Sequence, residues 1–104
     1  MLPPQTDFDT AALAESAEKV EEPPLYKVLL HNDDFTTMEF VVWVLESVFN
    51  MPEEQAIQVM LNVHLRGTGV AGIYTFEIAE TKVERTTALA REQEYPLLVT
   101  MEKA

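Results

Sequence analysis

The sequence predicts an α+β fold for a single small domain, with a three-stranded antiparallel sheet covered on one face by three helices. Three short runs rich in aliphatic residues have the composition of strands, and three segments between them repeat apolar residues at helical spacing. The expected order is therefore β-α-α-β-α-β. The chain has 104 residues and no internal repeat, so one domain with one modest core accounts for its length.

The chain divides near its Pro23-Pro24 pair. Residues 1–24 are expected to form a flexible acidic arm, because residues 1–22 carry six carboxylates against Lys19 alone, a net charge of −5. This arm is either an inert solubilising tail or a segment that a partner uses. Residues 25–104 are expected to form the folded domain.

The first half of the domain contains one predicted strand and one predicted helix. Residues 25–31, LYKVLLH, are aliphatic and β-branched, which predicts a strand. The cluster HNDDFTT is typical of a turn, and Thr36-x-x-Glu39 matches a capping box at the start of a helix. Trp43 falls on the polar side of this helix, so partial exposure is expected. The apolar stripe of the helix consists of Phe40, Val41, Val44, Leu45, Val48 and Phe49.

The second half contributes a helix, a strand, a helix and a final strand. The second helix is expected to begin at Pro52, which two glutamates follow, and to end at Gly67, which an arginine precedes. Residues 69–76 and 97–102 are predicted strands, and residues 77–93 have helical spacing. The apolar faces of the two helices are expected to contain Ala56, Val59, Met60 and Val63, and then Ile78, Ala79, Val83, Thr87 and Ala90.

Composition excludes several classes of function. The formal net charge is −11, so neither a nucleic acid nor an anionic membrane surface is an expected partner. No apolar run approaches the roughly 20 residues that span a bilayer, and the N-terminus has no secretory pattern, so a cytoplasmic protein is expected. The absence of cysteine excludes disulfides, thiolate zinc sites and cysteine nucleophiles. The expected partner is cationic or apolar.

Polar side chains gather where the first strand ends and the first helix begins. Asn32, Asp33 and Asp34 offer several acceptors close together, which suit a cationic donor such as an ammonium group. The alternative is a structural turn in which the carboxylates cap backbone N–H groups. His64 borders the apolar face of the second helix, where a lone histidine is usually a core-edge residue. Two flexible side chains either fill the core or line an adaptable pocket, namely Met38 and Met60.

Catalysis is not expected. A hydrolytic triad needs a nucleophile, but cysteine is absent, Ser16 lies in the arm, and Ser47 lies on an outer helical face. The loop aspartates and the two histidines lack the spacing of known zinc or calcium motifs. Adjacent Asp33 and Asp34 do not show the opposed carboxylates of a glycosidase. No catalytic residue, metal or cofactor is therefore predicted.

Four long motifs occur together in the domain: NDD-x-T-x-MEFV, ML-x-VH, E-x-AETKV and PLL-x-T-x-EKA. From Pro23 to Ala104 the sequence resembles, without an apparent gap, the ClpS family of bacterial Clp protease adaptors. The resemblance implies an adaptor that binds N-degrons, that is, proteins whose first residue is Leu, Phe, Tyr or Trp. It further implies delivery of these substrates to a ClpA-type AAA+ unfoldase that works with the ClpP peptidase.

The resemblance also implies roles for individual residues. Asn32 and His64 would bind the substrate's α-amino group, Asp34 would help through water, and Asp33 would shape the rim. The pocket for the first side chain would be enclosed by Thr36, Met38, Val41, Met60, Val63 and Leu97. The surface that contacts the unfoldase would include Glu77 and Lys82.

Some positions depart from the family pattern and leave an alternative open. Phe35 and Thr37 stand where Tyr and Pro are usual, so the loop is expected to be less rigid. His31 stands where an aliphatic residue is usual and is expected to add a titratable group at the rim. Met38 would be the gate that disfavours Ile and Val as the first residue of a substrate. Some bacteria carry a second ClpS-like protein with an altered preference, and these departures leave that alternative open. The alternative from another class is a general protein-interaction domain without a pocket for a terminal residue, similar in architecture to the C-terminal domain of the ribosomal stalk protein.

Overall fold

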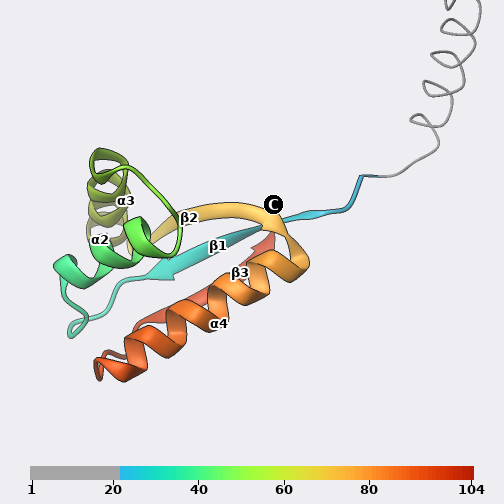
Figure 1. Cartoon of the computed structure of the whole chain (residues 1–104). Coiled ribbons are helices and arrows are strands. Elements are labelled where there is room, and N and C mark those ends of the chain that lie inside the picture. Colours follow the sequence, from blue (N-terminus) through green and yellow to red (C-terminus); the bar gives the residue numbers. More distant parts are fainter. Residues whose placement is uncertain (1–21) are drawn as a thin grey trace, which may run out of the picture.

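A computed structural model describes residues 22–104 and has the predicted order of elements (Figure 1). These elements are β1 (Leu25–His31), α2 (Met38–Ser47), α3 (Glu53–Arg66), β2 (Thr68–Thr75), α4 (Phe76–Glu92) and β3 (Leu98–Lys103). The α+β class is confirmed, and the first strand has the predicted bounds. The expected arm lies outside the described residues except for its last three positions.

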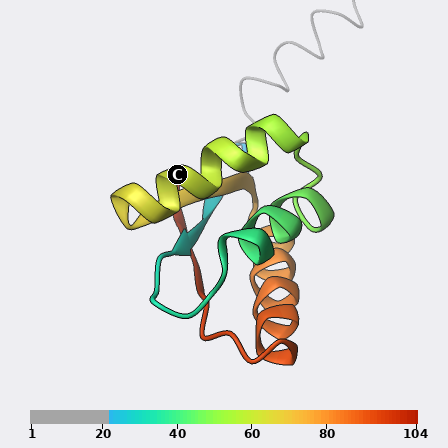
Figure 2. The same ribbon diagram turned by 90° about the vertical axis from the view of Figure 1, so that its left-hand side faces the viewer.

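The sheet is antiparallel and has the strand order β2-β1-β3, with β1 in the centre. Side chains of β1 alternate between its two faces, and Val28 and Leu30 on the inner face have no exposed surface. Leu30 lies opposite Val99 of β3, and Val28 lies opposite Met101, so apolar residues line this face in register. Figures 1 and 2 show α4 running alongside the sheet and the α2–α3 pair at one end of it.

The core forms where the helices meet the inner face of the sheet. The predicted apolar stripe of α2 and the segment after it are buried in the same cluster as Val28 and Leu30. Trp43, on the opposite side of α2, is 48% exposed, as expected from its place in the helical pattern. One stripe of α2 therefore faces the core while the other remains open to solvent.

Two helix details differ from the predictions. Thr37 rather than Thr36 caps α2, and its hydroxyl accepts a hydrogen bond from the Phe40 N–H at 3.1 Å. The predicted capping box is wrong because the Thr36 hydroxyl is used elsewhere, as a donor to Asp33. In α4 the predicted Ala79 and Ala90 are buried and Val83 packs against the core, but Ile78 is 50% exposed and Thr86 is buried in addition.

Glycines allow α3 to end sharply and to lie close to β2. Gly67 caps α3 with φ of 91°, in the left-handed region that glycine adopts most readily. At Gly69 a Cβ would lie 2.7 Å from Val63 Cγ2 and 3.1 Å from the Val59 carbonyl oxygen. Only a residue without a side chain therefore lets α3 approach the strand this closely.

Gly69→Ala is expected to lower the free energy of unfolding by about 1–3 kcal/mol, the usual cost of overpacking. The added methyl group has no room unless α3 moves away from β2. Urea denaturation followed by circular dichroism measures the effect. Val70→Thr, at an exposed neighbour, is the matched control and should change stability by less than about 0.5 kcal/mol. Equal stability of the two variants would contradict the close approach.

Candidate functional site

The loop between β1 and α2 is organised by the carboxylate of Asp33. Its Oδ1 accepts hydrogen bonds from the backbone N–H groups of Phe35 at 2.8 Å and Thr36 at 2.7 Å. Its Oδ2 accepts a third from the Thr36 hydroxyl at 2.7 Å. Asp33 therefore has the structural role that was the alternative for this cluster, in which a carboxylate caps backbone N–H groups of a turn. The side chains of Asn32 and Asp34 have no such partners among the described residues.

Asp33 is held in its charged form by these contacts. Burial by itself raises the pKa of its carboxyl group, but the hydrogen bonds from Thr36 and Phe35, with the positive charge of Arg91, outweigh that effect. The pKa of Asp33 consequently lies below its ordinary value of 3.8. The loop thus keeps a negative charge under all ordinary conditions.

A cavity of about 410 Å³ opens between this loop, the start of α2 and the C-terminal half of α3. It is lined by Asn32, Asp33, Asp34, Phe35, Thr36, Thr37, Met38, Val41, Met60, Val63 and His64. Ten residues are predicted from the sequence to form the pocket and its rim, and all of them except Leu97 line this cavity. Leu97 is 1% exposed and lies in the hydrophobic core with Val41 and Val63.

The cavity combines an apolar interior with a polar mouth. Val41 and Val63 are buried and Met60 is half-buried, so aliphatic surface forms the inner walls. Asn32, Asp34 and His64 are exposed, and their side chains supply acceptors at the edge. The exposed position of His64 differs from the core-edge alternative. Such a site can accept one apolar side chain together with a hydrogen-bond donor close to it.

A backbone hydrogen bond joins the loop to the end of α3. The Asn32 N–H donates to the Gly67 carbonyl oxygen at 2.8 Å. Gly67 follows His64 by three positions, so this bond holds the first loop residue near the last turn of the helix that carries the histidine. Two residues that lie 32 positions apart in sequence therefore reach the same cavity.

The connection between α4 and β3 contacts the end of the loop and the start of α2, and no local pattern in the sequence indicates this. Arg91 Nη1 donates to the carbonyl oxygens of Tyr95 at 2.8 Å and Leu97 at 3.0 Å. The Tyr95 ring lies 4.9 Å from the ring of Phe40, and the Thr37 hydroxyl donates a long bond of 3.4 Å to the Tyr95 hydroxyl. Only the aromatic character of Tyr95 hinted at this role, because its partners lie more than 50 positions away.

The residues predicted to contact an unfoldase lie away from the cavity, at the start of α4. Glu77 is exposed in the first turn. Lys82 is half-buried, and its Nζ donates to the Val48 carbonyl oxygen at 2.5 Å while lying 5.9 Å and 5.7 Å from the ring centres of Phe49 and Tyr74. Its charge therefore compensates the negative end of α2, which has no basic residue in its last turn.

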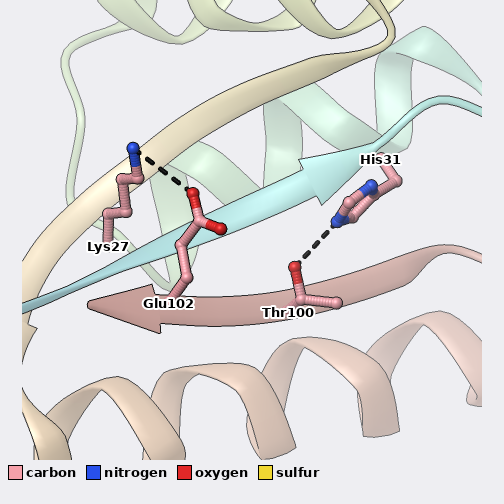
Figure 3. A network of polar contacts seen from close by, with 4 residues as sticks. All are labelled: Lys27, His31, Thr100 and Glu102. Carbon is pink, nitrogen blue, oxygen red and sulfur yellow. Dashed lines mark hydrogen bonds and ion pairs between the residues drawn. The ribbon is translucent and has the colours of Figure 1, made fainter. Parts of the chain in front are cut away.

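The outer face of the sheet carries two polar pairs that bridge β1 and β3 (Figure 3). Lys27 Nζ lies 3.3 Å from Glu102 Oε1, and His31 Nε2 lies 2.7 Å from the Thr100 hydroxyl. His31 is thus engaged with the sheet and does not line the cavity. Within residues 22–104 no three metal-ligating side chains cluster, and none of the helices there has the length and apolarity to cross a membrane.

Known proteins resemble this chain over most of its length. The family model described as ATP-dependent Clp protease adaptor protein ClpS matches residues 21–100. The ATP-dependent Clp protease adapter protein ClpS of Myxococcus xanthus is 53% identical over 98 residues, 92% of each chain. Its counterpart from Methylococcus capsulatus is 58% identical over 96 residues, 92% of this chain and 91% of the relative. The structure of Agrobacterium tumefaciens ClpS2 bound to L-phenylalaninamide superposes with a TM-score of 0.77 at 43% identity, covering 80% of this chain and 100% of the other.

Asp33→Asn is expected to destabilise the protein by about 1 kcal/mol at neutral pH, because it weakens three hydrogen bonds in a partly solvated loop. A carboxyl group whose pKa is lowered by folding stabilises the folded state above its unfolded pKa. The difference between wild type and variant should therefore shrink as the pH falls below about 3.8 through the lowered pKa.

The measurement is urea denaturation of both proteins between pH 7 and pH 2.5. Asp34→Asn is the control, since Asp34 makes none of these loop hydrogen bonds. A pH-independent difference for Asp33→Asn, or the same profile for Asp34→Asn, would exclude this role for Asp33.

Proposed function

The chain belongs to the ClpS family of Clp protease adaptors, and on this premise we propose that it binds N-degrons and delivers them to a ClpA-type AAA+ unfoldase working with ClpP. As a member of this family it is an adaptor and not an enzyme. The observation that carries the proposal is the cavity whose apolar interior lies directly beside exposed polar acceptors. Its proposed ligand is the first residue of a protein that begins with Leu, Phe, Tyr or Trp.

The free α-amino group supplies the donors that the mouth of the cavity can accept. An ammonium group carries three N–H donors and a positive charge. We assign its hydrogen bonds to the Asn32 side-chain oxygen and a His64 ring nitrogen, with Asp34 acting through water. The Asp33 carboxylate already accepts three hydrogen bonds within the loop, so it contributes to the shape of the rim and to its negative charge. An acetylated terminus lacks the charge and two of the donors, and each buried acceptor left unpaired costs about 1–3 kcal/mol.

The first side chain occupies the apolar interior in this proposal. Burial of a Leu or Phe side chain contributes roughly 1.5–3 kcal/mol. Met38 is 45% exposed at the mouth, where a β-branched residue would place its extra methyl group. The ligand of the Agrobacterium relative, L-phenylalaninamide, has the same two features, an aromatic side chain and a free amino group.

Delivery requires a second surface on the same domain. We take this domain to be residues 25–104. Glu77 is exposed and can pair with a cation of the unfoldase. The ammonium of Lys82 is engaged with Val48, so Lys82 would contribute to that contact mainly through the shape of the surface around it. Because α4 starts at a distance in sequence and structure from the cavity, both partners can bind at once.

A fluorescent peptide that begins with Leu or Phe should bind, and its acetylated version should bind about 5- to 150-fold more weakly. An Ile-initiated peptide should lose about tenfold or more, because of the clash at Met38. Fluorescence anisotropy measures the affinities. Equal binding of all the peptides would instead support a general interaction domain without a terminal-residue pocket.

Asn32→Ala should lower the affinity for every peptide with a free N-terminus. Met38→Ala should reduce the preference for Leu over Ile as the first residue. The first variant removes an acceptor, and the second opens the mouth of the cavity. Leu65→Ala is the matched control, because Leu65 is 76% exposed and does not line the cavity. If Met38→Ala left the ratio of Leu to Ile affinity unchanged, Met38 would not be the gate.

A further inference from the structure

A second cavity lies next to the first, in the groove between α2 and α3. Its volume is about 390 Å³. Its walls are formed by Met38, Glu39, Val42, Trp43, Glu46, Glu53, Ile57 and Met60. Trp43 and Ile57 are 48% and 39% exposed, so two large apolar side chains remain open to solvent in this groove. We call it the Trp43 groove.

The Trp43 groove adjoins the first cavity. Met38 and Met60 line both, so the two cavities lie on opposite sides of the same pair of flexible side chains. An extended polypeptide advances about 3.4 Å per residue. A chain whose first side chain occupied the first cavity could therefore place a side chain in the groove within roughly five residues.

Negative charge is concentrated on the half of the domain that holds both cavities. Residues 28–65 contain six Asp and Glu residues and no Lys or Arg, whereas the rest of residues 25–104 contains six of each sign. The net charge of −6 on the domain therefore belongs to this one segment. Three of its carboxylates line the Trp43 groove: Glu39, Glu46 and Glu53.

These carboxylates have no counter-ion in the part of the chain that the structure describes. The ion pair found there joins Lys27 and Glu102 on the outer face of the sheet. A second copy related by twofold symmetry would bring the same acidic face to the groove, and the arm before the domain carries a net charge of −5. Electrostatic repulsion disfavours both of these occupants.

We propose that the Trp43 groove binds the client polypeptide a few residues after its first residue, at an apolar side chain flanked by Lys or Arg. This inference rests on the proposed function of the first cavity. The apolar side chain packs against Trp43 and Ile57, while the basic side chains pair with the groove glutamates or lie over the Trp43 ring. The adaptor thereby selects clients by a downstream segment as well as by the first residue.

Trp43 provides a direct test, because it is the only tryptophan of the chain. Three peptides without Trp begin with Leu and continue with Phe and Lys, with Phe and Glu, or with Gly and Ser alone. The Phe-Lys peptide should bind about tenfold more tightly than the Gly-Ser peptide. It alone should shift the emission of Trp43 to shorter wavelength, since it covers the indole ring.

Two variants separate the groove from the first cavity. Trp43→Ala should remove the advantage of the Phe-Lys peptide and leave the Gly-Ser peptide unchanged in anisotropy. Glu46→Gln should lower the affinity for the Phe-Lys peptide about two- to threefold and reduce the salt dependence of its binding. Glu84→Gln, an exposed position of α4, is the charge control, and Leu65→Ala is the apolar control.

The outcomes distinguish the two proposals. Binding that requires a free Leu terminus but is equal for all three peptides would overturn the Trp43 groove and leave the first cavity intact. A loss of affinity for all three peptides in Trp43→Ala, with Glu46→Gln indistinguishable from Glu84→Gln, would also overturn it. Binding of the Phe-Lys peptide that is indifferent to acetylation would overturn the terminal-residue pocket instead.

Discussion

The burial of one stripe of α2 is the constraint on which the rest of the structure depends. Val44 and Leu45 have no exposed surface and share a core with Val28 and Leu30 of the central strand. Because a helix has fixed angular spacing, burial of this stripe also determines where its other side chains point. Met38 and Val41 then face the first cavity, while Trp43 and Glu46 face the second. Both candidate binding surfaces are consequences of how one helix packs.

The fold was predictable because it depends on periodicity within short segments. The apolar stripe of α2 and the turn before it can be recognised from neighbouring residues alone. The predictions that were wrong concern details that depend on competition between nearby groups or on distant contacts. Thr36 could have capped α2, but Asp33 takes its hydroxyl and Thr37 becomes the cap. Ile78 has helical spacing, yet the packing of α4 turns it to solvent.

The cavity was only partly accessible to reasoning from the sequence. Asn32 and His64 could be grouped because the resemblance to a family supplied their shared role, whereas spacing alone left each with a structural alternative. The hydrogen bond from Asn32 to Gly67 explains why they reach one cavity, and no local pattern reports it. Tyr95 was missed for the same reason, since its contacts with Thr37 and Phe40 join segments that are far apart in sequence.

In the proposed binding mode, the single side chain that the first cavity holds limits how tightly the adaptor can bind a client. One buried side chain contributes roughly 1.5–3 kcal/mol, and each hydrogen bond to a charged amine contributes about as much. After the entropic cost of association, which is at least about 4 kcal/mol, these contacts leave an affinity no tighter than about micromolar, or about −8 kcal/mol. With an association rate near 10⁶ M⁻¹s⁻¹, such a complex dissociates in about a second. In the proposed mode, a client held by its first residue alone would therefore dissociate within about a second, and additional contacts in the Trp43 groove would lengthen its residence.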